Sequence, residues 1–216
     1  AVRAAIDKTT PIMNVFEEND VIVVSDEIWS DIVFKGYKHI PTYSISEDAK
    51  RRTISIYAPS KTFNLAGLIG SYHIICDDYL REQLNKVATS THYNSMNVLS
   101  MHALIGAYRE KSIEWVDELN QVLEQNMKYT YDFIKNNVEG IEVSQTQGTY
   151  MVFLHCEDYC LKNHLTIDEL IQKGWDVGVD WQSGVQFHDP WGIRLNIALP
   201  HELLQEAMQR LKEYVF

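Results

Sequence analysis

The first third of the chain contains short runs rich in β-branched residues, each followed by polar residues. Three such runs predict strands over residues 21–25, 53–57 and 72–76. The first of them is apolar at successive positions, which is typical of a strand buried on both faces of a parallel sheet. About 25 residues separate the first two runs, which is enough for the crossover that a parallel pair needs. The pattern therefore predicts part of an α/β sheet.

The middle of the chain changes to the helical period. Apolar residues at spacings of three and four predict helices over 79–88 and 97–109, and a short helix is expected earlier, over 12–18. A much longer helix is predicted from about residue 113 to 136, with Ser112 as its N-cap. Its length is sufficient to connect two domains.

The last third alternates between strands and helices. Strands are predicted near 141–144, 150–155 and 193–197, and helices near 167–173 and 201–214. The predicted fold class is therefore α/β, with a second, smaller α+β part. We expect three regions: a partial large domain over 1–110, a connecting helix over 111–136 and a small C-terminal domain over 137–216.

Composition narrows the classes of protein to consider. The 216 residues include 30 acidic and 19 basic side chains, a net charge of −11, which argues against nucleic acid or an anionic membrane as partner. No apolar run approaches the roughly 20 residues of a membrane helix. The three cysteines imply no disulfide framework, and the first residues lack a signal-peptide pattern. We expect a cytoplasmic protein.

Three charged residues are candidates for chemistry. Asp26 and Lys61 follow the first two predicted strands, and ligands of open α/β sheets bind beyond the carboxyl ends of strands. The two residues form either a structural ion pair or a pyridoxal phosphate site, in which the amine bonds the cofactor aldehyde and the carboxylate pairs with the pyridine nitrogen. Arg194, in an apolar strand, forms either a structural salt bridge or a fork for a carboxylate.

The order of these motifs resembles one enzyme family. The matching segments are Ser25–Ile28, His39–Pro41, Ala58–Gly67, Gly148–Tyr150 and Arg194–Asn196. Together they resemble the fold-type I pyridoxal phosphate enzymes of the class I/II aminotransferase superfamily, and more narrowly the MalY- and PatB-like cystathionine β-lyase branch. The resemblance covers nearly the whole chain and corresponds to the second half of such enzymes. It implies the later part of their three-layer large domain, followed by the small α+β domain.

The resemblance implies roles for five residues. Lys61 is the lysine that bonds the cofactor and moves the α-proton, and Asp26 is the partner of the pyridine nitrogen. Trp29 lies against the cofactor, and Ser60 is a weaker candidate for a phosphate contact. Arg194 holds the substrate carboxylate. No metal site is expected.

Two positions depart from the aspartate-type aminotransferases. Those enzymes usually have a tyrosine three residues after the aspartate, where this chain has Trp29, which cannot act as a phenol. They also usually have a phosphate-binding arginine eight residues after the lysine, where this chain has Ile69. Both departures are typical of the β-lyase branch that the chain resembles, so they favour β-elimination over transamination.

The predicted function is therefore that of a pyridoxal phosphate-dependent carbon–sulfur β-lyase with a small amino-acid substrate. Cystathionine or another cysteine S-conjugate would give pyruvate, ammonia and a thiol. Two alternatives stay open: an aminotransferase on the same scaffold, and a non-catalytic remnant without cofactor. The family implies a homodimer. Because much of the family's cofactor cradle precedes the matched segments, a missing N-terminal half is a further expected partner.

Two other groups have simpler interpretations. Cys156 and Cys160, beside His155, have a spacing that could bind a metal, but without a second ligand pair a strand end and loop is favoured. His188 and Asp189, before a proline, form either an acid/base pair or a solvated turn, and the turn is favoured.

Overall fold

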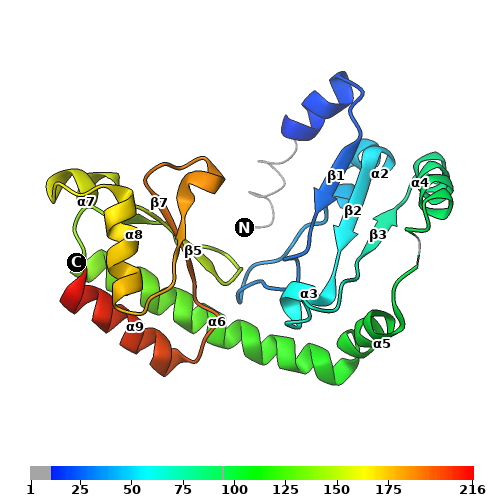
Figure 1. Cartoon of the computed structure of the whole chain (residues 1–216). Coiled ribbons are helices and arrows are strands. Elements are labelled where there is room, and N and C mark those ends of the chain that lie inside the picture. The colour runs from blue at the N-terminus through cyan, green and yellow to red at the C-terminus, as the bar shows by residue number, and fades with distance from the viewer. Residues whose placement is uncertain (1–10, 94) are drawn as a thin grey trace. The chain divides into compact units, whose positions relative to one another are not determined.

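The computed structural model describes residues 11–93 and 95–216, and they form two compact units (Figure 1). The first unit ends at Glu118 and the second begins at Leu119. Helix α6 (Glu110–Asn137) crosses this boundary and contributes to both. None of the helices within the described ranges is both long and apolar enough to cross a membrane.

The first unit contains a three-stranded sheet in the order β1-β2-β3. Its strands are β1 (Val23–Asp26), β2 (Thr53–Tyr57) and β3 (Tyr72–Ile75). β1 and β2 are parallel, as predicted, with Asp26 opposite Ile56. The connection between them contains helix α2 (Glu47–Arg52), which begins at the N-cap Ser46. The carboxyl ends of β1 and β2 therefore lie at the same edge of the sheet.

The direction of β3 was not predicted: it is antiparallel to β2, and the connection between them holds the four-residue helix α3 (Pro59–Thr62). One prediction for the sheet is wrong: β1 is not buried on both faces, since Val24 is 64% exposed. Within the part of the chain that the structure describes, β1 is an edge strand, so nothing pairs with its outer side.

The remaining helices of the first unit lie close to the predicted ranges. Residues 11–18 are helical, followed by η1 (Thr42–Ser44), α4 (Asp78–Ser90) and α5 (Val98–Ala107). The predicted cap of α6 is wrong, because this helix begins at Glu110, two residues before Ser112. Instead of capping the helix, the Ser112 hydroxyl donates a hydrogen bond to the Gly106 carbonyl at 3.0 Å.

The second unit is built on an antiparallel sheet in the order β4-β5-β7-β6. The strands are β4 (Glu142–Val143), β5 (Met151–His155), β6 (Gln182–Ser183) and β7 (Gly192–Asn196). The helices and turn are α7 (Glu157–Lys162), α8 (Ile167–Asp176), η2 (Gly184–Phe187) and α9 (His201–Tyr214). α9 has the predicted bounds, whereas α7 and β6 were not predicted. Helices and strands alternate here, as the sequence pattern indicates.

The core of the second unit forms where α6 and α9 bury their apolar faces. The fully buried side chains include Leu123, Met127, Leu154, Ile193, Leu204 and Leu211. Among them Leu204 and Leu211 are seven residues apart, which places them on one face of α9. Asn126 is buried among these groups, and its amide donates to the carbonyls of Ile197 and Leu199, both at 2.9 Å.

Asn126→Ala should destabilise the second unit. The substitution leaves two carbonyls without their donor and removes the partner of His201 Nδ1, which lies 2.8 Å from Asn126 Oδ1. We expect the free energy of unfolding to fall by roughly 2–3 kcal/mol. Urea denaturation measures this loss. Gln121→Ala, at an exposed position of the same helix, is the control, and an equal loss in both variants would contradict the assignment.

Candidate active site

Asp26 is the last residue of β1, and its carboxylate is exposed. One carboxylate oxygen, Oδ1, accepts a hydrogen bond from the backbone N–H of Ile28 at 3.1 Å. This short contact closes a turn around residue 27 and fixes the direction of the Asp26 side chain. Because side chains alternate along a strand, Asp26 and Glu27 point to opposite faces.

Lys61 lies in α3, four residues after the end of β2. Its side chain is half-buried, whereas every other lysine within residues 11–93 and 95–216 is exposed. Lys61 Nζ lies 5.9 Å from the ring centroid of Trp29, within the range of a cation–π contact. The indole therefore covers part of the amine without neutralising its charge.

The structure does not show the structural ion pair that was one interpretation of Asp26 and Lys61. Within the described ranges, neither residue forms an ion pair with any other side chain. Parallel pairing nevertheless brings their strand ends to one edge of the sheet. Ser60, beside the lysine, is half-buried, and its carbonyl accepts a hydrogen bond from Leu65 N at 3.0 Å.

The sequence did not indicate the role of Glu27, which is the most strongly bonded group near this edge. Its side chain is 5% exposed and accepts hydrogen bonds from four groups. The donors are His39 Nε2 at 2.7 Å, the Tyr57 hydroxyl at 2.7 Å, the Thr42 backbone N–H at 3.0 Å and the Ser55 hydroxyl at 3.0 Å. The matching segments Ser25–Ile28 and His39–Pro41 contain Glu27 itself and one of its partners, His39, which was the available signal.

These hydrogen bonds keep Glu27 charged. Burial by itself raises the pKa of Glu27, but the hydrogen bonds from His39, Tyr57 and Thr42 outweigh it and lower the pKa to about 2. Burial, together with the hydrogen bond to Glu27, raises the pKa of Tyr57. Glu27 is therefore a buried anion and Tyr57 a neutral donor at neutral pH.

Arg194 belongs to the second unit, in the centre of β7. Its guanidinium carbon lies 5.0 Å from the ring centroid of Phe187, and Nη1 donates to Gln182 Oε1 at 3.3 Å. The predicted alternative, a structural salt bridge, is not observed among the described residues. Arg194 thus has an aromatic ring on its face and one amide at its edge, which leaves further N–H donors for an anion.

The Asp189 carboxylate is hydrogen-bonded to His155, not to its neighbour His188. The Asp189 carboxylate bonds His155 Nδ1 at 2.8 Å, and this hydrogen bond raises the pKa of His155. His188 has a left-handed backbone conformation at the end of η2. An acid/base pair of these two neighbours is therefore wrong, because the partner of Asp189 is on β5.

Cys156 and Cys160 are buried thiols. Burial raises the pKa of both thiols, which disfavours the thiolate form that binds metals. In the described residues, no group of three or more histidine, cysteine or acidic side chains could hold a metal ion.

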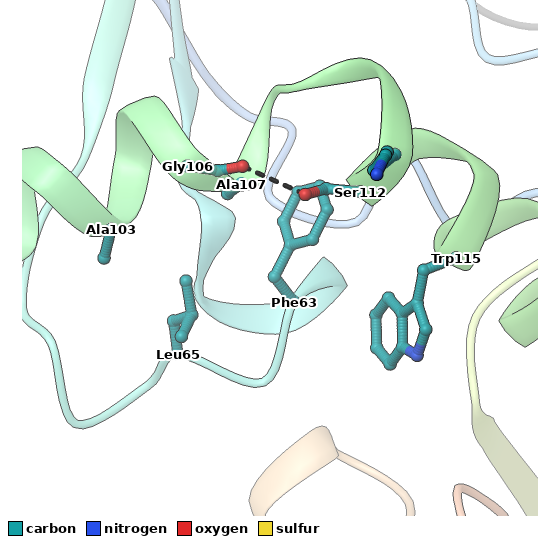
Figure 2. A pocket seen from close by; sticks show the side chains of 8 residues that line it. Phe63, Leu65, Ala103, Gly106, Ala107, Ser112 and Trp115 are labelled. Atoms are coloured by element: carbon teal, nitrogen blue, oxygen red, sulfur yellow. Dashed lines mark hydrogen bonds between the residues drawn. The ribbon is translucent and has the colours of Figure 1, made fainter.

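An open apolar pocket of about 450 Å³ lies in the first unit, beside the turn that carries Lys61 (Figure 2). Phe63 and Leu65, which follow the lysine, line one side, and Trp115 of α6 lies against Phe63 with ring centroids 6.4 Å apart. The residues that line the pocket include neither Asp26 nor Lys61. The pocket is therefore next to the candidate site and separate from its charged groups.

Known proteins match nearly the whole chain. A family model described as aminotransferase class I and II matches residues 3–211. Cystathionine β-lyase PatB of Bacillus subtilis (strain 168) is 31% identical over 198 residues, which are 90% of this chain and 50% of that protein. The chain spans about half the length of the curated relatives it matches.

Solved structures give the same result. A pyridoxal phosphate-bound putative aminotransferase from Clostridium difficile 630 matches with a TM-score of 0.87 and 30% identity, over 98% of this chain and 54% of that one. Cystalysin from Treponema denticola, whose structure contains pyridoxal 5′-phosphate, matches with a TM-score of 0.83 and 29% identity, over 96% and 52%. The predicted fold class and the predicted resemblance are confirmed.

Glu27 should make the first unit sensitive to acid. Its pKa of about 2 lies below the ordinary value of 4.5, so its contribution to stability is present above pH 4.5 and is lost as the pH falls toward 2. That loss amounts to roughly 2–3 kcal/mol. Urea denaturation of the wild type between pH 5 and 2 should therefore show a steeper fall in stability than the same series on Glu27→Gln.

Glu82→Gln is the matched control for this series. It makes the same change of charge at an exposed position of the first unit. We expect its stability to follow the wild-type pH dependence. Parallel pH profiles for the wild type and Glu27→Gln would show that Glu27 is not the acid-sensitive group.

Proposed function

Because the chain belongs to the aminotransferase class I and II family, we propose that it forms part of a pyridoxal phosphate-dependent carbon–sulfur β-lyase. Such an enzyme converts cystathionine or another cysteine S-conjugate, with water, into a thiol, pyruvate and ammonia. The similarity to a cystathionine β-lyase and to cystalysin supports the lyase branch. Trp29 and Ile69, which replace residues usual in aspartate-type aminotransferases, support it further.

The chemistry of the first unit fits this cofactor. Lys61 offers an amine that is half-buried and forms no ion pair in the described chain, and Asp26 offers an exposed carboxylate at the neighbouring strand end. Lys61 would bond the aldehyde carbon, Asp26 would accept the N–H of the pyridine nitrogen, and Trp29 would lie beside the amine. Ser60 would donate its hydroxyl to the phosphate. The two charges that form no ion pair among the described residues, at the carboxyl ends of the parallel strands β1 and β2, are the observation that carries this proposal.

The residues of this chain would then act on the substrate. When bound, pyridoxal phosphate accepts the electron pair that remains on Cα after the α-proton is removed. Once the amino group of the substrate has replaced Lys61 on the aldehyde carbon, the freed Lys61 Nζ would take that proton as a general base. Asp26 would accept the proton-bearing pyridine nitrogen as its hydrogen-bond donor, so its contribution grows as negative charge develops in the transition state.

Arg194 would bind the α-carboxylate of the amino acid. The ring of Phe187 covers the face of the guanidinium and Gln182 takes one Nη1 donor, so a carboxylate can approach the remaining donors in the plane. A fork of this kind orients the Cα–H bond as well as binding the substrate. This role belongs to the proposal and rests on the chemistry of the second unit alone.

The second candidate is an aminotransferase on the same scaffold. The family description and the putative aminotransferase from Clostridium difficile favour it. The two reactions differ in what is released: a lyase releases pyruvate and a thiol, whereas an aminotransferase needs a keto-acid acceptor and releases none of the thiol.

The whole protein's partners and location are also proposals. Helix α5 exposes apolar side chains, among them Val98 and Leu99. These side chains support two proposed partners: a second copy of the chain in a homodimer, and a separate chain that corresponds to the N-terminal half of the relatives. The net charge of −11 supports the proposals that neither nucleic acid nor a membrane is a partner. A cytoplasmic location and the division at residues 110 and 136 stay predictions.

Binding of pyridoxal phosphate by the purified chain tests the proposal. We expect an absorbance titration to give a saturable visible band, and Lys61→Ala to weaken the apparent affinity by about tenfold or more. Lys86→Ala is the matched control, because Lys86 is an exposed lysine of the same unit. It should bind as the wild type does.

Turnover then separates the candidates. Release of pyruvate and homocysteine from cystathionine supports the lyase, and conversion of a keto acid supports the aminotransferase. A folded chain that shows no cofactor binding dependent on Lys61 would contradict both and leave the non-catalytic remnant.

A further inference from the structure

Glu27 connects three segments that come from distant parts of the sequence. Its carboxylate receives donors from β2 and from the 39–42 segment, and it follows directly on β1. We propose that Glu27 is a positioning residue that fixes Asp26 and Lys61 relative to one another. This inference rests on the proposed function, because it is that function which requires the two groups to keep a set distance.

The first link runs from Glu27 to Asp26. The backbone N–H of Glu27 donates to the Ile56 carbonyl at 2.9 Å, which continues the parallel ladder by one bond beyond β1. The backbone N–H of Ile28 donates to Asp26 Oδ1 at 3.1 Å, so the hydrogen bond that orients the Asp26 carboxylate spans Glu27. A displacement of Glu27 therefore turns the Asp26 carboxylate.

The second link runs from Glu27 to Lys61. Tyr57, which donates to Glu27 Oε2 at 2.7 Å, is the last residue of β2, and Ala58 and Pro59 after it are buried. Only three residues separate Tyr57 from Lys61, and Pro59 restricts the backbone between them. Because this connection is short and restricted, the position of Lys61 depends on that of Tyr57.

The charge of Glu27 is what makes this arrangement rigid. Four donors converge on two oxygens, and an ionised carboxylate accepts from all of them, whereas a neutral amide of the same size offers one acceptor oxygen and adds two donors. Hydrogen bonds to a charged acceptor are also the stronger ones. Glu27→Gln therefore keeps the volume of the side chain, but the amide cannot accept all four hydrogen bonds.

Asp48 provides a matched control in the same unit. Its carboxylate is also largely buried and receives two hydrogen bonds from Arg52, at 2.6 and 2.7 Å. Asp48 and Arg52 are on α2, which leads into the start of β2, whereas Asp26 and Lys61 are at the opposite end of the strands. Asp48→Asn therefore loses a comparable interaction away from the candidate site.

The experiment compares cofactor binding in the wild type, Glu27→Gln and Asp48→Asn. Absorbance titrations with pyridoxal phosphate give both the amplitude and the apparent affinity. A variant that is only less stable loses amplitude in proportion to its unfolded fraction, and its folded molecules bind normally. We expect Glu27→Gln to weaken the affinity of the folded molecules about tenfold, and Asp48→Asn to change it less than twofold.

Hydrogen exchange measured on the chain without cofactor provides a second readout. The backbone amides of residues 26–28 and 60–63 should exchange at least about tenfold faster in Glu27→Gln, with the amides of the second unit unchanged. If Glu27→Gln does not fold, His39→Ala removes a single donor of the same carboxylate and should show the same two effects at smaller size.

The outcomes distinguish this inference from the proposed function. Equal affinities in wild type and Glu27→Gln, or equal losses in Glu27→Gln and Asp48→Asn, would overturn the positioning role while leaving the cofactor site intact. If the wild type shows no binding that depends on Lys61, the proposed function fails. In that case the exchange rates decide by themselves whether Glu27 fixes the two strand ends, and unchanged rates at 26–28 and 60–63 would overturn the inference.

Discussion

Parallel pairing of β1 with β2 is the constraint on which the candidate site depends. Because Asp26 lies opposite Ile56 in the ladder, the residues that follow each strand emerge at the same edge of the sheet. The two-residue alternation of a strand then sends Asp26 outward and Glu27 inward. The inward carboxylate gathers four donors, and the outward one stays exposed next to the turn that carries Lys61. One register thus accounts for both the buried anion Glu27 and the accessible carboxylate of Asp26.

Lys61 of the first unit and Arg194 of the second differ from several other charged groups of the described residues in how they are paired. Arg52 with Asp48, Lys128 with Asp132 and Arg210 with Glu206 form ion pairs within their own helices. Lys61 and Arg194 instead contact the faces of aromatic rings, those of Trp29 and Phe187, as Lys135 does with Tyr131. An aromatic face attracts and orients a cation without cancelling its charge, so the cation remains able to bind an anionic or electrophilic ligand. The roles proposed for Lys61 and Arg194 require a cation whose charge is not cancelled.

The sequence predicted the regular elements better than the short ones. β2 and α9 have the predicted bounds, because a β-branched run and a 14-residue amphipathic face leave strong periodic signals. α2, α3 and α7 were missed, since four to six residues complete too few turns for a period. The direction of β3 was not predicted, because the residue pattern of a strand carries no information on its direction. The order of the motifs was enough to select Asp26, Lys61 and Arg194 as candidates. Nothing in the sequence distinguished Glu27 from other acidic residues after a strand, and only the fold shows the four hydrogen-bond donors around it.

The central claim is that Lys61 is the cofactor lysine. The most direct test is to incubate the chain with pyridoxal phosphate, reduce it with borohydride and locate the pyridoxyl group by peptide mapping. The account predicts that the modification concentrates on the peptide containing Lys61, although this lysine is half-buried and the other described lysines are exposed. Modification spread over the exposed lysines in proportion to their accessibility, with Lys61 among the least modified, would contradict it.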